Sequence, residues 1–330
     1  MSAVAAGCDA PLGVAMRTLL IVLAVFLAIW IGAGAAMVAA AGTFRPSGIY
    51  VDIGGRKMRL VCAGPASGAQ PTVWMEAGAF GLAADWAAIQ EKLSARGIRS
   101  CAYDRAGMGW SDPGPRPRDS SAIVGDLEKL ISASGEPGPF ILMGHSMAGL
   151  HTRLFAARNP GLIAGLVLIE ATTPEQIDSP NTQKFLSAFT SISRLAAVSA
   201  TLGTTTPLYS KYGDRIGLPP QGSAEKRHAY VSGRHARTAA NEVETWPQSA
   251  AEAKAAAPYD SHWPVAVIVA ARNGLGPEWN DARKAPVRAS QAGYYEAVEG
   301  ASHTTILGET YGDAAVRGVE HILAHLTPAG

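Results

Sequence analysis

The sequence has few cysteines, almost no excess of charge and none of the common cofactor motifs, and each absence excludes a class of protein. Its 3 cysteines among 330 residues form no zinc-type cluster with histidine. The formal net charge is +1 and no basic block is present, so nucleic acid is not an expected partner. The chain also contains neither a G-x-x-x-x-G-K-S/T phosphate loop nor a repeat with a period of about 20 to 50 residues. We therefore expect no cofactor and no metal ion.

The most informative stretch is residues 144–149, Gly-His-Ser-Met-Ala-Gly, which follows the apolar run 140–143 and precedes the helix-compatible segment 150–158. A serine hydroxyl is a poor nucleophile in water. Hydrolases therefore hold it on a sharp turn from strand to helix, within reach of a histidine and of backbone N–H groups. Gly144 and Gly149 suit such a turn. The pattern predicts a nucleophile elbow, and the alternative is an ordinary turn with a buried serine.

Three further landmarks accompany this turn. Residues 72–81 comprise a buried strand followed by a loop of small residues, which can bring a backbone N–H against a substrate carbonyl. Residues 98–112 comprise a strand that ends in Asp-Arg-Ala-Gly-Met-Gly-Trp-Ser-Asp. Residues 294–303 comprise a late strand and a loop that ends in histidine, where a general base would lie.

With four landmarks in this order, the chain resembles the α/β-hydrolase superfamily. The resemblance is to the lidded branch with E-A-G at the oxyanion loop, D-R-x-G-x-G-x-S after the next strand and G-H-S-x-G/A-G at the elbow. It covers about residue 49 to the C-terminus and implies a mostly parallel sheet of eight strands, with helices on both faces and a helical lid. The expected organisation is an N-terminal tail with an anchor or signal segment (1–44), the first part of the core (45–173), a lid insertion (174–258) and the second part of the core (259–330).

The resemblance also implies roles for individual residues. It makes Ser146 the nucleophile, His303 the base, and the N–H groups of Ala79 and Met147 the oxyanion hole. The residues expected to support the elbow and its loops are Gly78, Gly144, Gly149, Asp104 and Arg105. Asp104 is not expected to be catalytic, because this fold places its acid after the nucleophile in the chain.

The acid of the triad is where this sequence departs from the family pattern. Asn273 stands after the strand 264–269, where many relatives carry aspartate, and asparagine cannot supply the negative charge that stabilises an imidazolium. The remaining candidates are Glu170, at the end of an earlier strand, and Glu278 and Asp281 on the later loop. Some superfamily members place the acid after the earlier strand, so we predict Glu170. The alternative is a carboxylate that only binds the turn.

The N-terminal region differs from the rest of the chain. Residues 18–42 contain no charge, and about 20 apolar residues cross a bilayer. Residues 19–31 are strongly apolar, whereas the second half of the run is rich in glycine and alanine. Two interpretations follow: a membrane anchor with an extracytoplasmic catalytic domain, which we favour, or a signal peptide cleaved near residues 39–41, which would give a secreted protein. Either interpretation exports the catalytic domain.

Cys62 and Cys101 are the two cysteines whose oxidation state depends on whether the catalytic domain is exported. If the chain follows the sheet order of the family, the strand 57–62 lies antiparallel to the strand 98–103, which brings the two sulfurs within disulfide distance. Two buried thiols are the alternative. Export favours the disulfide.

The lid is expected within the roughly ninety residues between the strands 166–169 and 265–270, which have helical patterning and no strand pattern. Its aromatic residues could line an acyl pocket or form the lid's own core: Phe185, Phe189, Tyr209, Tyr212, Tyr230 and Trp246. His228 and His235 share a helical face, but no cysteine or paired carboxylate lies near them, so we expect no metal site.

The predicted function is a serine hydrolase that cleaves small-molecule carboxylic esters through an acyl-enzyme and meets the membrane through its N-terminal segment. One alternative is a prolyl-iminopeptidase-like peptidase, in which Glu242 and Glu244 would bind the substrate amine. Another is a non-catalytic binding protein on the same fold. A dehalogenase or epoxide hydrolase with an aspartate nucleophile is not expected, because the elbow carries Ser146. Neither the physiological substrate nor the oligomeric state follows from the sequence.

Overall fold

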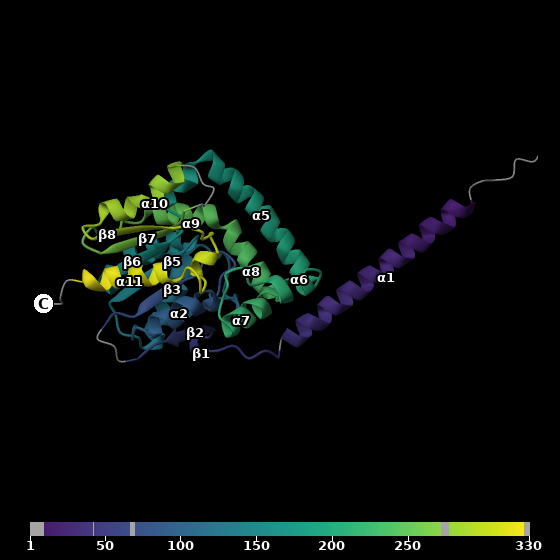
Figure 1. Cartoon of the computed structure of the whole chain (residues 1–330), viewed down its shortest axis with the longest axis horizontal. Coiled ribbons are helices and arrows are strands. Elements are labelled where there is room, and N and C mark those ends of the chain that lie inside the picture. The colour runs from purple at the N-terminus through teal and green to yellow at the C-terminus, as the bar shows by residue number, and fades with distance from the viewer. Residues whose placement is uncertain (1–9, 42, 67–69, 272–276, 327–330) are drawn as a thin grey trace, which may run out of the picture.

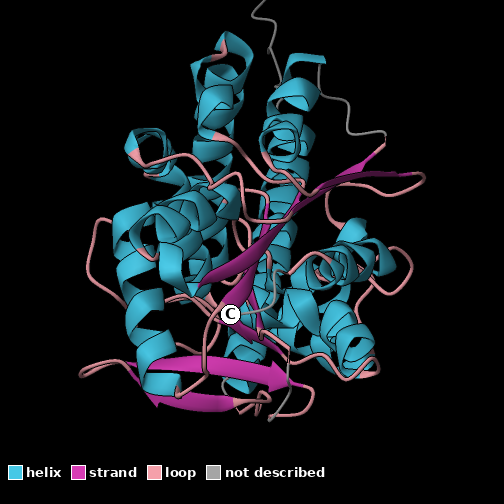
Figure 2. Ribbon diagram, turned by 90° about the vertical axis from the view of Figure 1, so that its left-hand side faces the viewer, coloured by secondary structure: helices cyan, strands magenta, loops and turns pink. Residues whose placement is uncertain are grey.

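Eight strands form a single sheet at the centre of the protein (Figures 1 and 2). The computed structural model describes residues 10–41, 43–66, 70–271 and 277–326. The strand order is β1-β2-β4-β3-β5-β6-β7-β8, antiparallel at β1, β2 and β4 and parallel from β4 to β8. The strands are β1 Ile49–Asp52, β2 Lys57–Ala63, β3 Val73–Glu76, β4 Ser100–Tyr103, β5 Phe140–His145, β6 Ile163–Ile169, β7 Val265–Ala270 and β8 Gly293–Val298.

Helices cover both faces of this sheet, because its central strands are apolar on both sides. Every residue of β3, β5 and β7 is buried, as parallel strands between two helical layers require. Helices α2 (Ala87–Ser94) and α11 (Asp313–Ala324) pack on one face. Helices α3 (Ser120–Ser134), α4 (Ala148–Arg158) and α10 (Pro277–Ala289) pack on the other. The expected eight-stranded, mostly parallel fold is confirmed.

The predicted start of β4 was wrong by two residues. The strand begins at Ser100, because the N–H of Ile98 donates to the carbonyl of Leu93 and so belongs to the end of α2. The sequence shows that Ile98 is apolar and next to a strand, but it does not show which carbonyl group its N–H binds. Only the folded arrangement decides this boundary.

Five helices connect β6 to β7, where the sequence has its helical patterning. They are α5 Pro180–Thr201, α6 Thr206–Tyr212, α7 Pro220–Tyr230, α8 Gly233–Glu244 and α9 Trp246–Ala255. Small side chains let α5 lie closely along α8, among them Ala197, Ala200, Ala236 and Ala240. The insertion reaches the elbow through α5 and α9, since Leu186 and Trp246 share a buried cluster with Met147 and Leu150.

A disulfide joins Cys62 to Cys101. The two cysteines are directly opposite each other in the antiparallel pair of β2 and β4, with Cα atoms 4.1 Å apart. The expected register of these strands is confirmed. The bond ties the antiparallel edge of the sheet to its parallel part.

Helix α1 (Ala10–Ala41) projects from the domain (Figure 1). Its segment Gly13–Ala40 has a mean hydropathy of 2.6 in its most apolar part, only 6% of which is buried in the structure. This segment is long and apolar enough to cross a membrane. A helix of this kind serves as a membrane anchor or as a signal segment.

Candidate active site

Ser146 occupies a tight turn between β5 and α4. Its φ of +57° lies in the left-handed region, which is unfavourable for a residue with a side chain. The elbow is close to its neighbours on both sides. A Cβ on Gly144 would lie 2.6 Å from Cγ2 of Thr152, and one on Gly149 would lie 2.3 Å from the carbonyl oxygen of Thr172. Both glycines are therefore required by close packing, as the sequence pattern predicts.

His303 lies on the loop after β8, beside the serine. Its Nε2 is 3.0 Å from Oγ of Ser146. The backbone of the same histidine is held from the elbow, because Nε2 of His145 donates to the carbonyl oxygen of His303 over 2.9 Å. Burial lowers the pKa of His145 to about 3, so its ring is neutral at physiological pH and acts only as a hydrogen-bonding group.

Glu170 completes the chain of hydrogen bonds. It directly follows β6, and its Oε2 is 3.0 Å from Nδ1 of His303. Its Oε1 accepts a hydrogen bond of 2.8 Å from the N–H of Ala270, and Nη1 of Arg283 lies 3.1 Å from Oε2. Burial raises the pKa of Glu170, but the hydrogen bond with His303 and the charge of Arg283 outweigh it and lower this pKa to about 2. The carboxylate is therefore charged at neutral pH.

The candidate acid Asp281 does not share this position. Asp281 has a side chain that is 72% exposed and lies 3.6 Å from Arg288. Asn273 lies outside the described residues, as does the side chain of Glu278. Within the described part of the chain, Glu170 is the carboxylate that contacts His303.

The loop after β3 approaches the elbow closely at Gly78. A Cβ at this position would lie 3.0 Å from both Cβ of Ser146 and Nδ1 of His145, so an alanine there would require the loop or the elbow to shift by a few tenths of an ångström. Ala79 follows it and packs beside Met147. Across the described backbone hydrogen bonds outside helices and strands, neither the N–H of Ala79 nor that of Met147 is a donor. The structure thus brings both predicted oxyanion residues together at the turn.

Arg105 holds the loop after β3 in place. Its guanidinium is buried and donates to the carbonyl oxygens of Ala77 and Gly78, the latter over 2.8 Å. It also binds the carboxylates of Glu76 and Glu242, each over 2.7 Å. Burial lowers the pKa of Arg105, but the two carboxylates outweigh it and raise this pKa, so the charge is retained. Arg105 therefore connects the oxyanion loop to the helical insertion.

Asp104 supports the neighbouring turns. Its carboxylate accepts from the N–H groups of Ala83 and Trp110 over 2.9 and 3.0 Å, and it pairs with the buried Arg59. These contacts lie on the side chain's own loop and on the start of the helix after β3. The structural interpretation of Asp104 thus agrees with its contacts.

Arg283 is a site residue that the sequence reasoning missed, whereas the position of His145 next to the elbow serine favours a packing or hydrogen-bonding role over titration in catalysis. Arg283 lies on α10 and reaches Glu170 across 113 residues of chain, through the ion pair and through Nη2, which donates to the Glu170 carbonyl oxygen over 3.1 Å. No local pattern marks such a partner. His145 did carry a signal, because it is the second residue of the elbow motif.

The aromatic residues of the insertion divide between two environments. Phe189 lies next to the elbow, with ring centroids 6.2 Å from both Trp246 and Phe80. Tyr209 and Tyr230 pack against each other inside the insertion at 5.7 Å. The expectation of a core within the insertion holds for Tyr209 and Tyr230, and the lining of an acyl pocket by Phe189 and Trp246 stays a prediction.

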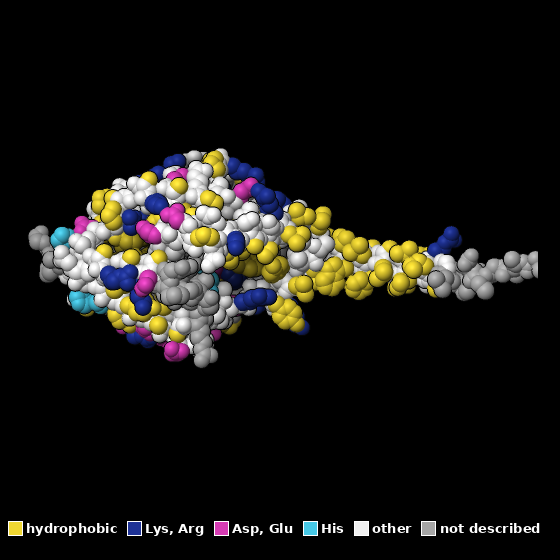
Figure 3. Space-filling view, turned by 90° about the horizontal axis from the view of Figure 1, so that it is seen from above, with side chains coloured by type: hydrophobic (Ala, Val, Ile, Leu, Met, Phe, Trp, Pro, Cys, Tyr) yellow, Lys and Arg dark blue, Asp and Glu magenta, His cyan; other side chains and the backbone are white. Residues whose placement is uncertain are grey.

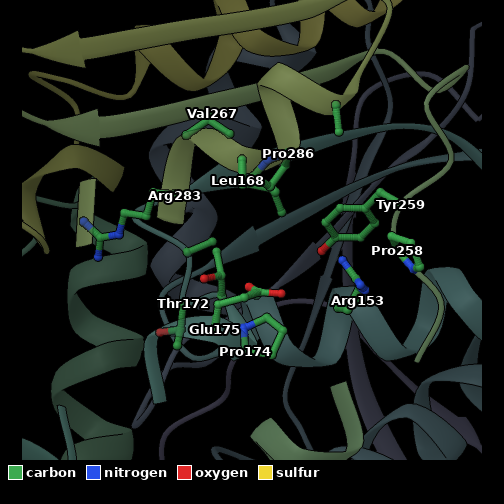
Figure 4. Close-up of a pocket in the computed structure, with 15 residues that line it drawn as sticks. Arg153, Leu168, Thr172, Pro174, Glu175, Pro258, Tyr259, Val267, Arg283 and Pro286 are labelled. Carbon is green, nitrogen blue, oxygen red and sulfur yellow. The ribbon is translucent and has the colours of Figure 1, made fainter. Parts of the chain in front are cut away.

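A cavity of about 210 Å³ lies behind the elbow (Figure 4). Arg283 lies at one end of it and Tyr259 with Arg153 at the other. The lining includes Gly149 but not Ser146 or His303. The cavity is therefore separate from Ser146 and His303, and it adjoins the site through Gly149 and Arg283.

His235, in the insertion, is engaged in hydrogen bonds with neighbouring loops. His235 is buried, accepts from the N–H of Gly109 through Nδ1 over 3.1 Å and donates from Nε2 to the carbonyl oxygen of Phe80 over 3.2 Å. Among the described residues, the grouping with metal-ligand geometry contains Cys62 and Cys101, whose sulfurs are already joined. Neither location offers a free set of ligands.

Comparison with known proteins agrees with this architecture. A model of the family described as "alpha/beta hydrolase fold" matches residues 71–309, which is more than half of the chain. The chain belongs to the α/β-hydrolase family. An uncharacterized protein of Schizosaccharomyces pombe is 25% identical over 230 residues, a match that covers 68% of this chain and 41% of that protein. This α/β hydrolase thus spans less than half the length of its curated relative.

Solved structures give the same result. A thermophilic esterase from Thermogutta terrifontis has a TM-score of 0.60 at 18% identity, over 84% of this chain and 99% of the esterase. An epoxide hydrolase mutant from Vigna radiata has a TM-score of 0.63 at 16% identity, over 83% of this chain and 98% of the other. At such identities the likeness shows the shared fold of the α/β hydrolases.

Proposed function

We propose that this α/β hydrolase is a serine hydrolase that cleaves carboxylic esters through an acyl-enzyme. One observation carries the proposal: two hydrogen bonds of 3.0 Å link Ser146 to His303 and His303 to Glu170, next to the loop of Ala79. A base within hydrogen-bond distance of a hydroxyl, oriented in turn by a carboxylate, is the arrangement that activates a serine.

The geometry supports the following sequence of steps. His303 takes the proton of Ser146 as Oγ attacks the ester carbonyl carbon, and the charge on Glu170 stabilises the imidazolium. The N–H groups of Ala79 and Met147 bind the oxyanion of the tetrahedral intermediate. The imidazolium then gives its proton to the departing alkoxide. In the second half of the reaction His303 takes a proton from a water molecule as the water attacks the acyl-enzyme carbonyl carbon. The imidazolium then gives this proton to Oγ of Ser146, which releases the carboxylic acid and the free serine.

The contacts of the insertion favour an ester over a peptide substrate. A peptidase of the prolyl-iminopeptidase kind would need Glu242 and Glu244 to bind the substrate amine. Glu242 is buried and neutralised by Arg105, and Glu244 pairs with Arg194 on the surface. An epoxide hydrolase or dehalogenase reaction is disfavoured because the elbow carries a hydroxyl instead of a carboxylate. A non-catalytic protein on this fold would have no need of the hydrogen-bond chain.

We further propose that α1 is retained as a membrane anchor and that the hydrolase domain lies outside the cytoplasm. The support is the length and apolarity of α1, together with the Cys62–Cys101 disulfide. Disulfides of this kind persist in oxidising compartments and are rare in the cytosol. The apolar cluster of Phe189 and Trp246 with Met147 at the elbow suits a substrate with an apolar acyl or aryl group.

A substrate panel with and without a serine-directed fluorophosphonate tests the reaction. We expect turnover of p-nitrophenyl esters but not of aminoacyl anilides, and one fluorophosphonate adduct at Ser146. Ser146→Ala should remove both the adduct and the turnover, with a loss of several orders of magnitude. An adduct on a different serine, or ester turnover that survives in Ser146→Ala, would refute the proposal.

A further inference from the structure

The insertion between β6 and β7 carries an apolar surface that no other described segment covers. Its six side chains are each more than half exposed, and we name them the outer α5–α6 face: Ile192, Leu195, Val198 and Leu202 along α5, and Leu208 and Tyr212 on α6. The four on α5 follow one another at helical spacing. An apolar patch of this length on a soluble protein marks a contact surface.

The opposite side of α5 is already occupied. Leu186, Ser193, Ala197 and Ala200 are buried there, against α8 and the elbow cluster. Helix α5 is therefore apolar on two sides, whereas a helix on the surface of a soluble domain needs only one apolar stripe. The second stripe requires a separate explanation.

Helix α1 joins the domain beside this outer face. Nε1 of Trp30 donates to the carbonyl oxygen of Thr204 over 2.8 Å, in the turn between α5 and α6. Gly34 lies against the same turn so closely that a Cβ there would be 2.0 Å from the carbonyl oxygen of Gly203. The contact with α1 thus begins one residue after Leu202 of the outer face.

The part of α1 beyond this contact has the length of a bilayer core. Residues 13–29 project away from the domain (Figure 1), and at 1.5 Å per residue they span about 26 Å, close to the ~30 Å thickness of the hydrocarbon layer. Arg17 lies four residues from the outer end of this stretch, where its long side chain can extend to the headgroups. Trp30 stands at the end of this span, and tryptophan concentrates at the boundary between lipid and water. The outer α5–α6 face lies at that same boundary.

The orientation of α5 suits such a surface. Figure 1 shows α5 running across the direction of α1, on the side of the domain from which α1 departs. Figure 3 shows hydrophobic side chains continuing from α1 onto the adjoining surface of the domain. Lys184 and Lys211 are exposed on α5 and α6, where their charges can meet anionic headgroups.

We propose that the outer α5–α6 face rests on the lipid bilayer that α1 crosses, so that the hydrolase domain is bound to the membrane surface through α5 and α6 as well as tethered by α1. The bilayer is the occupant because the contact of Trp30 with Thr204 places this face at the lipid boundary. The inference rests on the retention of α1 as an anchor and is independent of the chemistry of Ser146.

The test uses the full chain in nanodiscs of phosphatidylcholine and phosphatidylglycerol. Both variants are made in a Cys8→Ser background. The test variant, Leu195→Cys, carries an environment-sensitive fluorophore on the outer α5–α6 face. The matched control, Glu320→Cys, carries the same fluorophore on α11, at a side chain that is 49% exposed. Nitroxide-labelled lipids should quench the fluorophore at position 195 at least twofold and leave position 320 unchanged. Equal quenching at the two positions would overturn the proposal.

A second measurement uses the unmodified chain and does not depend on the folding of a variant. A photoactivatable phosphatidylcholine should form adducts within residues 192–212 in addition to α1. Adducts confined to α1 would show that the outer α5–α6 face is exposed to water and would overturn the proposal. A dimer in detergent that shields position 195 would identify a second copy of the chain as the occupant and would also overturn it. Intact mass reports whether α1 is retained. Turnover of a soluble ester reports the proposed reaction separately from membrane contact.

Discussion

At the scale of single residues, the charge of Glu170 decides how the site operates. The carboxylate accepts hydrogen bonds from His303 and from the backbone of Ala270, and Arg283 pairs with it. Three partners hold one orientation of the carboxylate, which in turn fixes the tautomer of the imidazole that faces Ser146. In the proposed mechanism Glu170 therefore acts through His303.

We expect Glu170→Gln to lower kcat by roughly four orders of magnitude, because an amide cannot stabilise the imidazolium. Fluorophosphonate labelling of Ser146 should slow in parallel, measured as a rate of adduct formation by intact mass. Asp281→Asn is the matched control, since its side chain is exposed and paired with Arg288. If the control lost activity and Glu170→Gln retained it, the acid would belong to the later loop.

We expect the carboxylate of Glu170 to affect the stability of the protein in acid. Its pKa is lowered from 4.5 to about 2 in the folded state. The contribution of Glu170 to the free energy of unfolding is thus complete above pH 4.5 and is lost as the pH falls towards 2. In urea titrations, wild type should lose stability faster than Glu170→Gln across this interval. Parallel curves for the two proteins would contradict the lowered pKa.

At the scale of elements, the carboxyl ends of neighbouring parallel strands bring the site together. Ser146 follows β5, Glu170 follows β6 and His303 follows β8, and the loop after β3 adds Ala79. Because parallel strands end at the same edge of the sheet, residues far apart in the chain converge there. The β3 loop also approaches the elbow closely, since a Cβ on Gly78 would lie 3.0 Å from Cβ of Ser146.

We expect Gly78→Ala to move this loop away from Ser146 and to reduce kcat by about a hundredfold, the effect of losing one oxyanion donor. Gly125→Ala on α3 is the control, because no atom lies within 4 Å of a Cβ at that position and alanine favours a helix. Steady-state kinetics on one ester, with thermal melting of both variants, make the comparison. Unchanged kcat in Gly78→Ala would exclude a donor on this loop.

How much the sequence predicts varies between these elements. The strands β5 and β7 are continuous apolar runs, and the small residues around Ser146 mark the turn, so both were predictable. The partners of Glu170 were not, because Arg283 arrives from α10 after more than a hundred residues, and ion pairs of this range leave no local pattern. The division of the insertion's aromatics between the elbow cluster and internal packing also depends on helix packing that periodicity does not determine.

At the scale of the whole molecule, the hydrolase domain and α1 define a topology. An uncharged span followed by a disulfide-linked domain fits a protein inserted from the cytoplasm with its domain exported. The proposed bilayer contact of α5 and α6 adds a second point of attachment on the same side of the membrane.

Fusion of alkaline phosphatase to the C-terminus should give an active phosphatase, and fusion of a fluorescent protein that folds only in the cytoplasm should remain dark. The reason is that both reporters follow the domain to its compartment. Cell fractionation before and after carbonate extraction then separates an anchored protein from a secreted one. Bright cytoplasmic fluorescence with no phosphatase activity would place the domain inside the cell.

The disulfide between Cys62 and Cys101 has a consequence for proteolytic cleavage of the domain. The bond closes a covalent ring, since the two cysteines are 39 positions apart in sequence. This ring contains β3, α2 and the loop with Ala79. A single peptide-bond cleavage inside the ring opens it but leaves one molecule, in which both new ends stay attached to the sheet. The segment that carries the oxyanion loop can thus be nicked once without being released.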